Sequence, residues 1–277
     1  MMTSVALLRF KDSLKSTLSA GLNLIGGFSN LKSPILIKPN ICTISDGTGS
    51  SVTDVNAVEA IARLFLEDDQ GLAIKIVESD SQSKYAEEAF EKFGYADLEK
   101  KMKKEGFNVS LVNLSKSPLV KADFKGRYFN RPELPELLVN PHYYVTVAAA
   151  KTHYLTTITG ALKNQFGVLP RKDQSFYHPD IDDVVVDLNN LLQPDLCIVD
   201  ARVGVEGWNG PKTKRLDAFI IGYKPASVDA TMARIMGLKP SEIRHVLESS
   251  KLGLGNIDPI VLGETIESVQ VAFNRPR

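Results

Sequence analysis

The sequence predicts an α/β fold in which a mainly parallel central sheet carries helices on both faces. Short runs rich in β-branched residues recur along the chain, and longer amphipathic stretches separate them. This alternation is typical of strands joined by helical crossovers, which cover both faces of a parallel sheet. A length of 277 residues is enough for one large core, so we expect residues 1–277 to form a single domain.

The β-branched runs predict strands at residues 4–8, 35–37, 73–77, 108–112, 143–148, 196–199 and 218–221. The amphipathic stretches between them predict helices at residues 11–24, 54–67, 84–93, 155–166, 181–191, 227–236 and 241–248.

Two segments depart from this alternation. In residues 119–138, Lys125 and Gly126 lie between two short β-like arms, and several turn-forming residues follow. This pattern predicts a small β-hairpin excursion near residues 119–131 rather than a domain boundary. Residues 259–273 are expected to return as one or two edge strands.

Charge and hydropathy exclude two classes of partner. Lysine plus arginine total 33, as do aspartate plus glutamate, so the basic excess typical of nucleic-acid-binding proteins is missing. No apolar run approaches the roughly 18 residues of a membrane span. The start of the chain becomes polar too soon for a signal peptide, which favours a cytoplasmic location.

The two cysteines, Cys42 and Cys197, lie far apart and lack the Cys-x-x-Cys spacing. We therefore expect no metal or iron–sulfur site held by this chain alone. As single thiols they are expected to be buried and apolar.

Polar residues follow several predicted strands, where ligands bind in open α/β sheets. The segments are 38–40, 78–80, 151–153 and 200–202, the last leading into a glycine-containing loop at 204–211. We expect the side chains at these strand ends to converge in one pocket, namely Lys38, Asn40, Lys151, His153, Lys163 and Asp200. Under the simpler alternative, these loops are polar only because loops face solvent.

Residues 151–167 carry the strongest signal. If the strand continues, Lys151 and His153 leave the same face about 6–7 Å apart and point at one ligand. On the predicted helix, Lys163 shares a stripe with Thr156 and Gly160 and reaches back toward the amides at the helix start. Such a cluster suits a carboxylate or a phosphate. The alternative is that Lys163 is a solvated surface lysine.

His178 lies in a long loop that could cover the pocket, and Glu206 lies in the loop after the sixth strand. The sequence contains no Walker lysine motif, nucleophile elbow or His-Glu-x-x-His helix. The candidate catalytic residues are His153, His178 and Lys151, and the candidate substrate-binding residues are Lys38, Asn40, Lys163, Asn164, Asp200 and Glu206.

The chain resembles the family known as domain of unknown function 362 over nearly its whole length. The resemblance rests on five ordered segments, at residues 38–40, 151–167, 178, 199–210 and 228–237. It implies redox or cofactor-related work, because members often carry a ferredoxin-like iron–sulfur module that this sequence lacks; a redox role would then need an iron–sulfur partner protein or a bound organic cofactor. The family is also distantly similar to nickel-pincer lactate racemases, in which basic and histidine residues handle a 2-hydroxy acid.

Three functions follow from these observations. The first is an enzyme acting on a small carboxylate or phosphate metabolite, with lysines as anion anchors and histidines as proton-transfer groups. The second is a non-catalytic accessory protein that binds a cofactor, metal centre or metabolite for a redox partner. The third is an interaction module without a pocket. The sequence identifies no particular cofactor or substrate.

Overall fold

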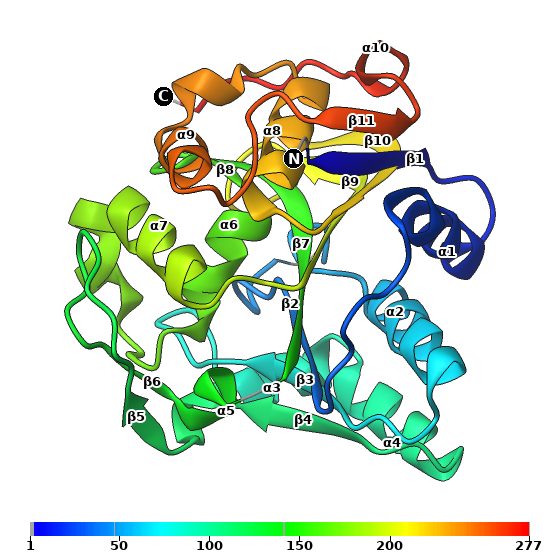
Figure 1. The fold of residues 1–277 in the computed structure, drawn as a ribbon, viewed down its shortest axis with the longest axis vertical. Coiled ribbons are helices and arrows are strands. Elements are labelled where there is room, and N and C mark those ends of the chain that lie inside the picture. Colours follow the sequence, from blue (N-terminus) through cyan, green and yellow to red (C-terminus); the bar gives the residue numbers. More distant parts are fainter. Residues whose placement is uncertain (1–2, 47, 141, 277) are drawn as a thin grey trace.

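A nine-stranded sheet forms the centre of the computed structural model, which describes residues 3–46, 48–140 and 142–276. Its order is β11-β1-β10-β9-β7-β2-β3-β4, and β8 pairs with β7 (Figure 1). The strands are β1 (Ser4–Arg9), β2 (Ile35–Pro39), β3 (Ile74–Glu78), β4 (Val109–Asn113), β7 (Tyr143–His153), β8 (Thr157–Thr159), β9 (Leu196–Val205), β10 (Thr213–Gly222) and β11 (Ile260–Gly263).

Most neighbouring strands are parallel. The pairs β4–β3, β3–β2, β2–β7, β7–β9 and β1–β11 run parallel, whereas β10 is antiparallel to both β1 and β9, and β8 is antiparallel to β7. The predicted fold class is therefore confirmed.

Helices cover both faces of the sheet, as Figure 1 shows for α6 and α7 on one side and α1 and α2 on the other. Alternation along the strands builds two cores: Tyr144 and Ala148 of β7 face one, and Val145 and Val147 face the other. The helices are α1 (Leu14–Ile25), α2 (Val55–Asp68), α3 (Ala86–Lys92), α4 (Tyr95–Lys104), α5 (Glu136–Val139), α6 (Ala161–Asn164), α7 (Ile181–Leu191), α8 (Pro225–Ile235), α9 (Arg244–Lys251) and α10 (Ile266–Val269). Within the described residues, no helix is long and apolar enough to span a bilayer.

The seven predicted strands correspond to β1, β2, β3, β4, β7, β9 and β10. The predicted hairpin is also present, because β5 (Leu119–Lys121) pairs antiparallel with β6 (Glu133–Pro135) in a separate two-stranded sheet. The tail contributes β11 at the edge beside β1. The helix α4 was not predicted.

The predicted helix at residues 155–166 is wrong over its first half. Thr157–Thr159 instead form β8, and helical structure begins only at Ala161. Three threonines and Ile158 are β-branched and favour a strand, and this strand pairs with the end of β7. The stripe of Thr156, Gly160 and Lys163 therefore does not exist as one helix face.

Candidate functional site

A cavity of about 190 Å³ lies at the carboxyl ends of β2, β3 and β7. Helix α6 and two 3₁₀ segments, η2 (Gln165–Val168) and η3 (Gln174–Asp180), form further parts of its wall, and residues 41–42, residues 81–84 and Trp208 also contribute. Seven of the nine residues predicted for the site line it: Lys38, Asn40, Lys151, His153, Lys163, Asn164 and His178. The position at the strand ends is the one expected for a ligand site in an α/β sheet.

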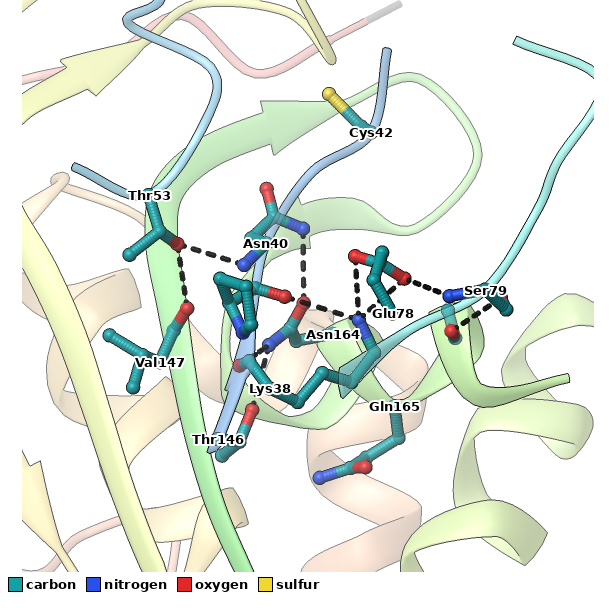
Figure 2. Close-up of polar contacts among 12 residues, drawn as sticks. Lys38, Asn40, Cys42, Thr53, Glu78, Ser79, Thr146, Val147, Asn164 and Gln165 are labelled. Carbon is teal, nitrogen blue, oxygen red and sulfur yellow. Dashed lines mark hydrogen bonds and ion pairs between the residues drawn. The ribbon is translucent and has the colours of Figure 1, made fainter. Parts of the chain in front are cut away.

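A buried ion cluster forms one side of the cavity. Lys38 at the end of β2 places its Nζ 3.0 Å from both carboxylate oxygens of Glu78, which ends β3 (Figure 2). Lys84 approaches the same carboxylate at 3.6 Å and donates to the carbonyl of Ser79. Burial lowers the pKa of Lys38, and Glu78 offsets part of this effect. The carboxylate of Glu78 therefore compensates the charge of two buried lysines, Lys38 and Lys84.

Lys151 is held by neutral acceptors. Its Nζ lies 2.5 Å from Oδ1 of Asn40 and 2.8 Å from the carbonyl oxygen of Ser51. Asn40 in turn donates from Nδ2 to Oδ1 of Asn164 at 3.1 Å (Figure 2). Asn164 is fixed by its own donations to the carbonyl of Lys38 and to Oγ1 of Thr146. This network orients Lys151 without neutralising its charge.

Lys163 is the second of the cavity lysines that has no carboxylate partner among the described residues. It is partly buried, and its ammonium lies 5.3 Å from the ring centroid of Phe166. Burial, followed by repulsion from Lys151, lowers the pKa of Lys163 to about 8. The lowered pKa indicates that this ammonium would gain from an anionic neighbour.

The two cavity histidines are uncharged near neutral pH. Burial, followed by Lys163 and Lys151, lowers the pKa of His153 to about 2. The Nδ1 of His153 accepts the backbone N–H of Leu155 at 3.1 Å, so we infer that the ring proton sits on Nε2. Burial and Lys163 also lower the pKa of His178. The cavity thus offers two neutral imidazoles beside its lysines.

Asp200 and Glu206 do not reach this cavity, contrary to the expectation that Asp200 converges with the others. Strand β9 continues through residue 200 to Val205, so Asp200 is not a strand end. Its carboxylate binds Arg202, which also contacts Asp54, at the wall of a separate cavity of about 460 Å³. Glu206 pairs with Lys214 at 2.6 Å and accepts from Asn274.

Sequence reasoning missed several cavity residues. Glu78 and Lys84 were not assigned to the site, although Glu78 follows a predicted strand. Cys42 was expected to be a buried apolar thiol, but it is only partly buried and its Sγ lies 3.4 Å from Nζ of Lys151. Cys197 is fully buried, as expected. No sequence signal marked Gln174, which is buried in the cavity wall with an unpartnered Nε2.

The charged groups lining the cavity are four lysines and one carboxylate, namely Lys38, Lys84, Lys151, Lys163 and Glu78. Across the described ranges there is no group of three or more histidine, cysteine, aspartate or glutamate side chains placed to hold a metal. Two neutral imidazoles, several amide groups and aromatic side chains such as Phe166 and Trp208 also line the cavity. This arrangement is suited to an anion that both accepts hydrogen bonds and compensates positive charge.

Comparisons with known proteins place the chain in a family and a fold. The family model described as "Domain of unknown function (DUF362)" matches residues 35–234. Thylakoid-associated protein sll1697 of Synechocystis sp. is 27% identical over 92% of this chain and 81% of its own length. The lactate racemase apoprotein of Thermoanaerobacterium thermosaccharolyticum superposes with a TM-score of 0.51 at 13% identity, covering 84% of this chain and 57% of that one. The last similarity is one of fold, and this chain matches little more than half of that protein.

Proposed function

The chain belongs to the DUF362 family, and from the geometry of its cavity we propose that it binds a small anionic metabolite, a carboxylate or a phosphate. One observation carries this proposal: the ammonium groups of Lys151 and Lys163 line the same cavity, and neither has a carboxylate partner among the described residues. Leaving two such charges together is unfavourable unless a ligand compensates them. A bound anion would do so.

The size of the cavity supports a small ligand. A volume of about 190 Å³ is below the range of about 300–1,000 Å³ that accommodates drug-sized molecules. We assign Lys151 and Lys163 as the charge anchors, with Lys38 and Asn164 holding the surrounding frame. Asn40 orients Lys151 through its side-chain oxygen.

We propose that the histidines give the site its capacity for proton transfer. In the inferred tautomer, Nε2 of His153 is a hydrogen-bond donor, so this ring would stabilise negative charge on a ligand. His178, on segment η3, is then the better candidate for accepting a proton.

Binding without catalysis is the second candidate, as in an accessory protein that carries a cofactor or metabolite to a redox partner. It is favoured by the engagement of Nδ1 of His153 with the backbone of Leu155, which leaves a single imidazole free to act as a base. Proton exchange into a bound acid from deuterated water separates the two candidates, because a carrier would leave the acid unlabelled.

Replacement of Lys163 by methionine tests the anion site. Lys163→Met keeps most of the apolar stem and removes the charge. Sulfate, inorganic phosphate and short carboxylic acids are the probes, measured by calorimetric titration. We expect affinity for the bound probe to fall by roughly 1.5–3 kcal/mol, the value of a charge-assisted hydrogen bond.

An exposed lysine provides the control. Lys100 has a side chain 70% exposed, so Lys100→Met should leave both affinity and stability within about 0.5 kcal/mol of the wild type. Unchanged affinity in Lys163→Met would remove Lys163 from the site. Failure of the wild-type protein to bind any of these anions would overturn the proposed function.

A further inference from the structure

Asp229 is a carboxylate fully buried on α8, next to the start of α6. One of its oxygens accepts the backbone N–H of Ala161 at 2.6 Å, and the other accepts that of Leu162 at 3.0 Å. A Cβ at Gly160 would lie 2.2 Å from Oδ1 of Asp229, so a larger residue there would displace the carboxylate. Asp229 is therefore packed tightly against both the backbone amides of α6 and Gly160.

The first turn of α6 carries two residues of the anion site. Ala161 and Leu162 are followed directly by Lys163 and Asn164, which both line the cavity. A helix of four residues has little stability of its own, because nucleation is unfavourable. Its start therefore depends on the acceptors that Asp229 supplies.

Asn164 connects the start of α6 to the opposite side of the cavity through hydrogen bonds. Its Oδ1 accepts from Asn40, whose own side-chain oxygen accepts from Lys151. A shift at the start of α6 would thus move Lys163 directly and Lys151 through two hydrogen bonds. Both charge anchors are tied to one carboxylate.

The carboxylate is costly to keep where it is. Among the described residues it has no ion pair, and its titratable neighbours are His245 of α9 and Cys197 of β9. His245 itself is 3.2 Å from Asp182 through Nδ1. Burial raises the pKa of Asp229 to about 6, which means that the charged form is less stable here than in water.

We propose that Asp229 is a positioning residue of the anion site: it fixes the first turn of α6 so that Lys163 and Asn164 face the cavity. This inference rests on the proposed function for its effect on binding. It assigns Asp229 no contact with the ligand.

The test uses Asp229→Asn with Asp187→Asn as a matched control. Asp187 is also buried and accepts backbone N–H groups, those of Arg127, Tyr128 and Phe129, but it holds the hairpin excursion instead of the cavity wall. Asparagine at either position keeps one acceptor and replaces the other with a donor. At pH 7.5 we expect Asp229→Asn to lower sulfate affinity at least fivefold, because one α6 amide loses its acceptor. Asp187→Asn should lower stability and leave affinity within twofold.

The pH profile distinguishes positioning from a general structural role. Sulfate keeps its charge between pH 7.5 and pH 5, whereas Asp229 becomes protonated and loses one acceptor oxygen. A change in any other group that titrates over this range would affect both proteins alike, so the ratio of wild-type to Asp229→Asn affinity isolates Asp229. This ratio should fall toward one at pH 5. A ratio that stays constant would overturn the proposal.

Two further measurements do not need a ligand. Hydrogen exchange at the amides of Ala161 and Leu162 should accelerate at least tenfold in Asp229→Asn and remain unchanged in Asp187→Asn. The rate of acetylation of Lys163 at pH 8, followed by mass spectrometry, should also change only in the first variant. If the wild type binds no anion but both rates change, the proposed function fails and the positioning role stands. If neither rate changes, the positioning role fails.

Discussion

Nζ of Lys151 and Oδ1 of Asn40 lie 2.5 Å apart, and the lysine side chain is fully buried. The nearest acceptor of this ammonium is thus a neutral amide oxygen, at a position where a carboxylate would have neutralised its charge. Asn40 differs from aspartate by one atom of similar size. The asparagine therefore keeps the geometry of an ion pair and leaves the positive charge available. This relationship connects the packing of the strand ends to the proposed recognition of anions.

Asn40→Asp should weaken anion binding, because it places a carboxylate of the protein itself beside Lys151. The new carboxylate would pair with Lys151 and repel an incoming anion, so we expect sulfate affinity to fall by roughly 10- to 100-fold, about 1.4–3 kcal/mol. Calorimetric titration measures the change. Asn23→Asp on the exposed surface of α1 adds the same charge remotely and should shift affinity less than twofold. Binding that is preserved in Asn40→Asp would show that the charge of Lys151 is not used.

Removal of Glu78 should strongly destabilise the protein. Lys38 and Lys84 would remain buried with no carboxylate between them, and breaking such a buried pair costs about 3–5 kcal/mol. Glu78→Gln should therefore lower the free energy of unfolding by that amount in urea titrations. Addition of Lys38→Met to this variant should recover part of the loss, since one uncompensated charge disappears. A further loss on adding Lys38→Met would contradict the pairing.

The sheet was predictable because its strands have strong local signals. The run at residues 143–148 contains two tyrosines, three β-branched residues and an alanine, and it belongs to a strand buried on both faces. Parallel strands bring their carboxyl ends to the same end of the sheet, so Lys38 and Lys151 could be expected to converge because each follows a predicted strand. The register of β2 with β7 confirms that they share this end.

The start of α6 could not be predicted, because its position depends on a distant residue. Periodicity alone extended the helix back through residues 155–160, whereas pairing with β7 takes Thr157–Thr159 into the sheet. The helix then begins where Asp229 accepts its first amides. Asp200 was misplaced for a related reason: β9 extends beyond its β-branched run because it pairs with the long strand β10. The β-branched residues at 156–159 did give a local signal for β8, but the helical periodicity of residues 155–166 outweighed it.

Segment η3 is held over the cavity by contacts that should control its opening. Nζ of Lys172 lies 3.4 Å from the ring centroid of Tyr85, and the backbone N–H of Gln174 donates to Oε1 of Gln82. A cation–π contact of this kind is worth about 0.5–1 kcal/mol when exposed. Tyr85→Leu should therefore speed tryptic cleavage after Arg171 or Lys172 by about two- to fivefold. Tyr85→Phe keeps the ring and should match the wild type; equal acceleration in both variants would rule out the ring contact as the cause.

Anion affinity should fall as the pH rises through about 8, because Lys163 loses its proton there. Its pKa is lowered first by burial and then by Lys151, so the ammonium is largely present at pH 7 and largely absent at pH 9. Sulfate does not titrate in this interval, and two pH units across one pKa change the charged fraction by about tenfold. We expect sulfate affinity to drop by up to that factor between pH 7 and pH 9. Lys163→Arg should abolish the drop, since a guanidinium stays charged throughout, and Lys163→Met should bind weakly at both values. A pH-dependent loss that persists in Lys163→Arg would assign the titration to another group.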